Sequence, residues 1–220
     1  MEVRPFGLWE SPLNPGDLAS TGRFRDLAWD GDGKTLVWLE DRGQGGTLVS
    51  QRDADAPRIL NPNQPSRAQV GYGGGEFAVS SGCLYFSGAE GRLWRQPLAG
   101  GRSHPLTPAF GKSAAPTPSP DGHWVVYIHS AEDRDCIAVV DASGVAWPAR
   151  LIGGADFYMQ PAWHPRGKML AWIEWNHPQM PWNGTRLVLG HLRFPRGAAP
   201  VVEETTMVAG DTSTAVFQPL

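Results

Sequence analysis

The chain has 220 residues, of which 27 are glycine, 20 are proline and 10 are tryptophan. Glycine and proline together make up about one fifth of the chain, against roughly 12 % in average proteins, which excludes a helix bundle because both residues interrupt helices. Hydrophobic residues make up 41 % of the chain, which excludes a disordered chain. The net charge is −3 and no run of Lys or Arg occurs, which argues against a nucleic-acid partner.

Neither a membrane segment nor a disulfide framework is predicted. No apolar run approaches the roughly 20 residues that a membrane-spanning helix needs, and residues 1–16 lack the basic and apolar regions of a secretory signal. The chain has two cysteines, Cys83 and Cys136, which are too few for a disulfide framework in a chain of this length. We therefore expect both to be free thiols. These observations predict a cytoplasmic protein that binds no membrane.

Four segments share one pattern, in which a short strand, a tight turn with glycine and an apolar strand follow one another. They span residues 27–38, 77–86, 117–127 and 161–172, and their turn glycines are Gly33, Gly82, Gly122 and Gly167. The glycines recur at spacings of 49, 40 and 45 residues, which is typical of propeller blades with four strands. Glycine suits such turns because the backbone there often needs a positive φ.

Each unit continues with two further strands. The third strands are predicted at 47–50, 93–96, 137–140 and 186–189, and the short fourth strands at 58–60, 104–106, 150–152 and 206–208. A flat five-stranded sandwich is the alternative fold, but it predicts no fixed period, and a parallel β-helix needs a far shorter one. We therefore predict an all-β fold, a partial β-propeller of about four four-stranded antiparallel blades.

The predicted boundaries follow from these repeats. A lead segment occupies 1–23, the blades occupy 24–62, 63–108, 109–153 and 154–210, and the last blade carries a long hairpin insertion. The segment Phe217–Leu220 resembles the start of the fourth unit at Tyr158–Pro161, so residues 211–220 are predicted to begin a fifth blade. The sequence is therefore expected to be a fragment of a longer chain, and the fragment alone is expected to self-associate through its uncovered blade face.

Several motifs resemble the N-terminal propeller of the prolyl oligopeptidase family of serine peptidases. They are Phe6–Leu13, the glycine-rich Gly71–Val79, Asp156–Tyr158 and, most specifically, the His-Pro-x-Met-Pro-Trp pattern within Trp175–Leu187. The nearest branch is similar to acylaminoacyl-peptidases and dipeptidyl-aminopeptidases, whose blades are related to those of TolB. The chain departs from this family at Gly71, where the family has glutamate, and at Asn183, where it often has aspartate.

The resemblance implies a non-catalytic role for this chain within a serine peptidase. The implied partners are a C-terminal α/β-hydrolase domain, which carries a Ser-Asp-His triad, and short peptides that the propeller admits to the active site and helps to bind. The chain itself has no G-x-S-x-G motif, so no catalytic residue is assigned to it. It also has no clustered metal ligands and no phosphate-binding loop, so no metal and no cofactor is predicted.

Two stretches are candidates for the substrate path or the domain interface. The first contributes Trp175, His177, Met180 and Trp182, because a surface loop seldom carries so many apolar and aromatic side chains unless it covers something. The second contributes Arg67, Tyr72 and Glu76, whose polar groups flank a glycine run that permits close approach of a peptide. Packing on their own blades is the alternative for both stretches.

Two other functions are compatible with a propeller. The first is a TolB-like module that binds proteins and has no enzyme attached, since a fold does not fix a function. The second, an enzyme with its site in the central channel, would need convergent acidic residues or metal ligands, and the sequence offers none. A reading frame that continues into a G-x-S-x-G region would favour the peptidase.

Overall fold

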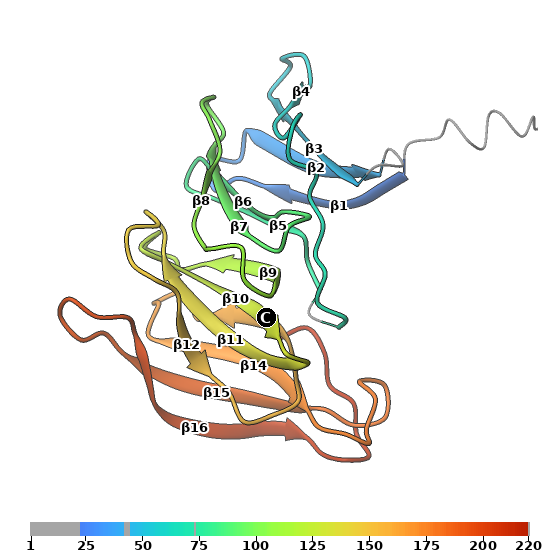
Figure 1. Cartoon of the computed structure of the whole chain (residues 1–220), viewed down its shortest axis with the longest axis vertical. Coiled ribbons are helices and arrows are strands. Elements are labelled where there is room, and N and C mark those ends of the chain that lie inside the picture. The colour runs from blue at the N-terminus through green and yellow to red at the C-terminus, as the bar shows by residue number, and fades with distance from the viewer. Residues whose placement is uncertain (1–22, 42–44, 73, 220) are drawn as a thin grey trace, which may run out of the picture.

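The computed structural model describes residues 23–41, 45–72 and 74–219 (Figure 1). Sixteen strands form four antiparallel sheets of four strands each, and no helix occurs in these residues. The predicted all-β fold with four four-stranded antiparallel sheets is confirmed. The motif at 6–13 and all of the predicted lead segment except Arg23 lie outside the described residues.

Each sheet takes four consecutive strands in chain order, and we call the sheets blades 1 to 4. Blade 1 holds β1 (Arg23–Trp29), β2 (Thr35–Asp41), β3 (Gly46–Arg52) and β4 (Arg58–Ile59). Blade 2 holds β5 (Phe77–Ser80), β6 (Cys83–Ser87), β7 (Leu93–Pro97) and β8 (His104–Pro105). Blade 3 holds β9 (Lys112–Pro118), β10 (Trp124–Ala131), β11 (Arg134–Asp141) and β12 (Ala149–Ile152). Blade 4 holds β13 (Phe157–Trp163), β14 (Met169–Trp175), β15 (Arg186–Arg193) and β16 (Val201–Gly210).

The core consists of separate layers between consecutive blades. Val37, Leu39 and Leu48 of blade 1 pack with Leu84 and Phe86 of blade 2. A second layer joins Tyr85 and Leu93 to Val125 and Tyr127, and a third joins Ile128 and Ile137 to Leu170 and Trp172. A single twisted sheet cannot cover both of its apolar faces, so each blade depends on its neighbours.

The four glycines of the repeat occupy the predicted hairpin turns. Gly33, Gly82, Gly122 and Gly167 have φ values of 65°, 73°, 71° and 69°. A Cβ atom at the first three would meet nothing within 4 Å. Glycine is therefore needed there for its backbone conformation and not for space.

The turns also define the two ends of the blades. The hairpins β1–β2, β5–β6, β9–β10 and β13–β14 form what we call the glycine-turn end. The loop 176–185 between β14 and β15 lies at the other end, which we call the insertion end. Because consecutive strands are antiparallel, the β2–β3 and β10–β11 turns also lie at the insertion end.

A second repeated feature interrupts the first strands of blades 3 and 4. Ala115 and Gln160 have φ values of 50° and 52°, each precedes a proline, and the pairing with the next strand shifts at both places. Gln218 has the same conformation, with φ of 55°, and precedes Pro219. The resemblance to the start of the fourth unit therefore extends to the backbone at Gln218 and Pro219.

The fourth strand of blade 4 is longer than predicted. The sequence pattern placed it at 206–208, whereas β16 extends over Val201–Gly210 and pairs along the whole of β15. Most of its residues are exposed, so the strand lacks the apolar alternation on which the prediction relied.

Replacing Gly122 by alanine tests the conformational role of the turn glycines. We expect Gly122→Ala to lower the free energy of unfolding by about 1 kcal/mol, because an alanine side chain is strained at positive φ. Gly31→Ala is the control, since Gly31 has equally open surroundings and no positive φ. Urea unfolding of both variants checks this, and equal losses would contradict the explanation.

The first strand of blade 1 leaves apolar side chains in solvent. Phe24, Leu27 and Trp29 are 75 %, 64 % and 57 % exposed. We expect the chain alone to self-associate through this strand, because β1 pairs with only one of the strands in the described residues and a row of apolar groups on such a strand favours pairing. Leu27→Glu is expected to shift the assembly toward monomer in sedimentation equilibrium, with Val145→Glu as a control at an exposed apolar residue outside β1. A monodisperse wild-type monomer would contradict this expectation.

Candidate functional site

The linker between blades 1 and 2 is fixed by backbone hydrogen bonds before it reaches the glycine run. Ser66 exchanges two hydrogen bonds with Gly46, at 2.8 and 2.9 Å, and its hydroxyl donates to the Ser87 carbonyl at 3.2 Å. A Cβ atom on Gly46 would lie 2.9 Å from the Ser66 carbonyl oxygen, so this approach requires glycine. Asn61 reinforces the linker by accepting from Leu48 N at 2.7 Å and donating to the Gly46 carbonyl at 3.0 Å.

This linker carries Tyr72 into a group of aromatic rings from blade 4. The Tyr72 ring meets Phe157, Trp175 and Trp182 edge-on, at centroid distances of 5.9, 5.7 and 6.4 Å. Phe157 stacks on Trp175 at 5.1 Å, and His177 meets the Phe157 ring edge-on at 4.9 Å. We call these five residues the aromatic cluster, which lies at the insertion end.

The aromatic cluster has a buried base and an exposed tip. Trp175 is 3 % exposed, whereas Trp182 is 63 % exposed and Tyr72 is 37 % exposed. The indole N–H of Trp175 is buried and has no hydrogen-bond partner within the described part of the chain. Aromatic faces of this kind can contact apolar side chains and cations.

Hydrogen bonds hold the insertion that carries Trp182 at both ends, one end to the start of blade 4 and the other to the segment that follows it. Asp156 N donates to the Asn176 side chain at 2.8 Å, and His177 N donates to the Asp156 carboxylate at 2.9 Å. At the other end the Thr185 hydroxyl donates to the Val216 carbonyl at 2.8 Å. The loop is therefore held in position at both ends.

The structure brings together residues from both predicted stretches, but not all of them. Tyr72, Trp175, His177 and Trp182 belong to the aromatic cluster. Arg67 is exposed and bonds through its backbone N–H to the Ser87 carbonyl. Met180 supplies its carbonyl to Asn183 N at 2.9 Å.

Glu76 lies apart from the aromatic cluster and joins blades 1 and 2. Its carboxylate is 2.8 Å from the Arg25 guanidinium, and the residue is 8 % exposed. Burial raises the pKa of Glu76, although the charge of Arg25 and a hydrogen bond from Ser66 oppose this. The residue therefore acts at the contact between blades.

Phe157 is the member of the aromatic cluster that the sequence did not single out. It belongs to the Asp156–Tyr158 motif, which resembles a segment of the prolyl oligopeptidase family. A phenylalanine at the start of a strand is indistinguishable from an ordinary core residue in a single sequence. Its position between Trp175 and His177 is visible only in the structure.

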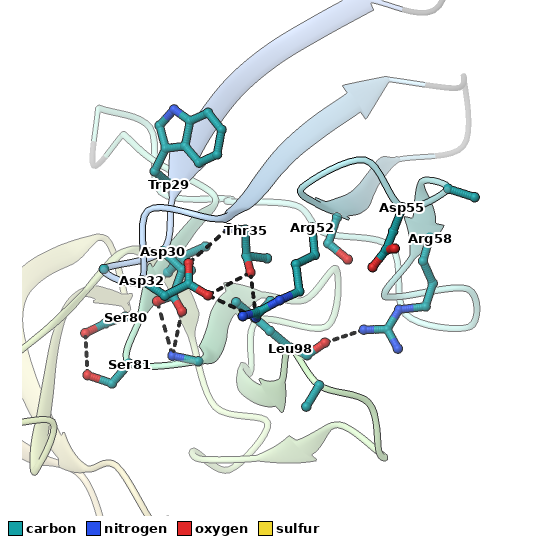
Figure 2. Close-up of a pocket in the computed structure, with 16 residues that line it drawn as sticks. Trp29, Asp30, Asp32, Thr35, Arg52, Asp55, Arg58, Ser80, Ser81 and Leu98 are labelled. Atoms are coloured by element: carbon teal, nitrogen blue, oxygen red, sulfur yellow. Dashed lines mark hydrogen bonds and ion pairs between the residues drawn. The ribbon is translucent and has the colours of Figure 1, made fainter.

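A groove of about 980 Å³ lies at the glycine-turn end, between blades 1 and 2 (Figure 2). Asp30 accepts hydrogen bonds from Gly82 N at 3.0 and 3.1 Å, and so links the two blades. Asp32 pairs with Arg52 at 3.0 Å, and the backbone N–H of Lys34 is the main cause that lowers the pKa of Asp32. Both carboxylates are thus satisfied by the protein, and the predicted β-hairpin turn at Asp30–Gly33 is confirmed.

No catalytic arrangement is visible in the described residues. Among residues 23–41, 45–72 and 74–219, no hydroxyl or thiol donates to a histidine ring, and no cluster of three His, Cys, Asp or Glu side chains could hold a metal ion. Within these ranges no helix has the length and apolar character to cross a bilayer.

Comparison with solved structures reveals close similarity to peptidases. The chain aligns with a puromycin-hydrolysing peptidase from Mycobacterium tuberculosis over 97 % of its length, with a TM-score of 0.78 and 28 % identity. A second puromycin hydrolase gives a TM-score of 0.79 and 25 % identity. The resemblance to the propeller of the prolyl oligopeptidase family is confirmed.

The similarity concerns part of those peptidases. The chain covers 36 % of the length of each. A TolB protein from Agrobacterium tumefaciens aligns with 86 % of the chain at 17 % identity and a TM-score of 0.61, which shows a shared propeller fold and no more. No protein-family model and no curated sequence matches the chain.

The raised pKa of Glu76 predicts a pH dependence of stability. Because the folded protein holds this proton to higher pH than the unfolded chain, the contribution of Glu76 to stability falls as pH rises from about 4.5 through the folded pKa. The free energy of unfolding of wild type relative to Glu76→Gln should therefore decrease over this interval in urea titrations. Arg25→Gln should make this decrease steeper, because the charge of Arg25 opposes the rise in the pKa of Glu76. If the stability of wild type relative to Glu76→Gln instead grew with pH, the raised pKa of Glu76 would be contradicted.

Proposed function

We propose that this chain is the propeller part of a serine peptidase similar to the acylaminoacyl- and dipeptidyl-aminopeptidases. The observation that carries the proposal is the alignment of nearly the whole chain with about a third of each puromycin-hydrolysing peptidase, at 25–28 % identity. Because the chain corresponds to only 36 % of each of these peptidases, a protein of their length also has room for a separate α/β-hydrolase domain. The free thiols Cys83 and Cys136 are compatible with the cytoplasmic location that we include in the proposal.

The aromatic cluster is the surface through which this propeller would act. It is exposed at Trp182 and fixed at its base by Trp175, and its members come from segments that are 85 to 110 residues apart in the chain. In the proposed peptidase the insertion end faces the hydrolase domain and borders the route of short peptides to the active site. Folded proteins are excluded by size.

The propeller contributes shape and contact area, and the chemistry belongs to the other domain. An acyl-enzyme would form on the serine of the hydrolase domain. The residues described here offer no proton donor or acceptor paired for that reaction. The alternative, a TolB-like interaction module, is supported only by a likeness in fold.

Activity measurements on the complete reading frame test the proposal. We expect the gene to encode a G-x-S-x-G region and its product to hydrolyse aminoacyl-p-nitroanilides, whereas residues 1–220 alone should show no turnover. In the complete protein, Trp182→Ala should change kcat/KM for peptides of five or more residues at least threefold, because it alters the wall of the proposed route.

Phe194→Ala is the matched control, since Phe194 is an exposed aromatic residue at the glycine-turn end. It should leave kcat/KM within twofold of wild type. Turnover by residues 1–220 that survives repurification, or a reading frame without the hydrolase region, would overturn the proposal. Equal effects of the two variants would remove the assigned role of the aromatic cluster.

A further inference from the structure

A second cavity, which shares no lining residue with the aromatic cluster, lies on the face of blade 3 that meets blade 2. Its volume is about 460 Å³, within the range of pockets that hold small ligands. Three segments line it, namely residues 107–110 of the linker, the middle of β10 and β11, and residues 147–150. None of these residues belongs to the predicted site.

The strand register explains how the cavity forms. Tyr127 of β10 pairs with Ala138 of β11, which pairs with Arg150 of β12, so these three side chains lie in one row on the same face of blade 3. The small methyl group of Ala138 leaves space between the two long side chains. In the adjacent row His129 pairs with Cys136, and both also line the cavity.

Tyr127 lines this cavity and brings a hydroxyl group to it. The residue as a whole is only 3 % exposed, so its ring is fixed between the strands. Burial raises the pKa of Tyr127, so the group remains a neutral hydroxyl that can donate a hydrogen bond. A ligand oxygen in the cavity could accept a hydrogen bond from this hydroxyl.

Arg150 supplies a positive charge at the edge of the same cavity. It is exposed, and it forms no ion pair within residues 23–41, 45–72 and 74–219. The side chain passes over Gly153, where an added Cβ atom would be 3.2, 3.6 and 3.8 Å from Cδ, Nε and Nη1 of Arg150. The hydroxyl of Tyr127 and the guanidinium of Arg150 are both donors, so the complementary group is an anionic oxygen acceptor.

The remaining walls are apolar and aromatic. Phe110 and Trp147 line the cavity and are 62 % and 79 % exposed, although large apolar side chains favour burial. Phe110 stacks on the His129 ring at 5.7 Å, and burial lowers the pKa of His129, which favours a neutral ring. These walls suit a flat apolar body.

We propose that this cavity is a binding site for small aromatic carboxylates. The carboxylate accepts hydrogen bonds from the Tyr127 hydroxyl and the Arg150 guanidinium, and the ring packs over Ala138 against Phe110 and Trp147. The site is independent of the proposed peptidase function, because it uses neither the aromatic cluster nor the insertion end loop 176–185.

Titration of the chain with 2-naphthoate tests this site, with neutral 2-naphthamide as the matched ligand. By calorimetry we expect naphthoate to bind at least tenfold more tightly than the amide. Tyr127→Phe and Arg150→Gln should each weaken naphthoate binding at least fivefold, since each removes one donor to the carboxylate. Arg134→Gln, which removes an exposed arginine from the same blade outside the cavity, should leave the affinity unchanged.

The thiol of Cys136 gives an independent readout of occupancy. It lines the cavity, and burial raises its pKa to about 11, so it should react slowly with a maleimide at neutral pH. Saturating naphthoate should slow the labelling of Cys136 at least threefold in the wild-type protein. The slowing should be smaller in Tyr127→Phe. Peptide mass mapping measures the extent of labelling. Equal affinity for naphthoate and naphthamide, unchanged affinity in both variants, or unprotected Cys136 would each overturn the proposal.

Discussion

The burial of apolar side chains between consecutive blades is the interaction on which the rest of the structure depends. Each sheet presents apolar side chains on both faces and covers neither alone. Full burial of one large apolar side chain stabilises a fold by roughly 1.5–3 kcal/mol, and Phe86 and Trp172 are completely or almost completely buried in two of these layers. The hairpin turns, the linkers and the aromatic cluster all rely on sheets that this contact holds side by side.

The sequence was sufficient for the blades because their signals are local and repeated. A glycine at positive φ, a preceding short strand and a following apolar strand lie within about a dozen residues, and the pattern occurs four times. The length of β16 escaped prediction because its side chains are largely exposed and carry no alternation. Local chemistry therefore predicts a strand well only where one of its faces is buried.

The composition of the sites depends on contacts that no local pattern encodes. Tyr72 and Trp182 were both singled out, but their meeting across more than 100 residues follows from the packing of blade 4 against the linker after blade 1. The row of Tyr127, Ala138 and Arg150 required the register of three strands. In a single sequence these three residues resemble core and surface positions of ordinary strands.

The insertion of Ser66 between Gly46 and Gly88 has a mechanical consequence. Because Ser66 forms bridges to both residues, β3 of blade 1 and the end of β6 in blade 2 are connected by backbone hydrogen bonds as well as by side chains. Force applied to one of these two sheets is transmitted to the other through amide groups, which deform little. Displacement of blade 1 against blade 2 therefore has to break backbone hydrogen bonds as well as side-chain contacts, and the hydrogen bond from Ala115 N to the Gly75 carbonyl extends the same type of connection to blade 3.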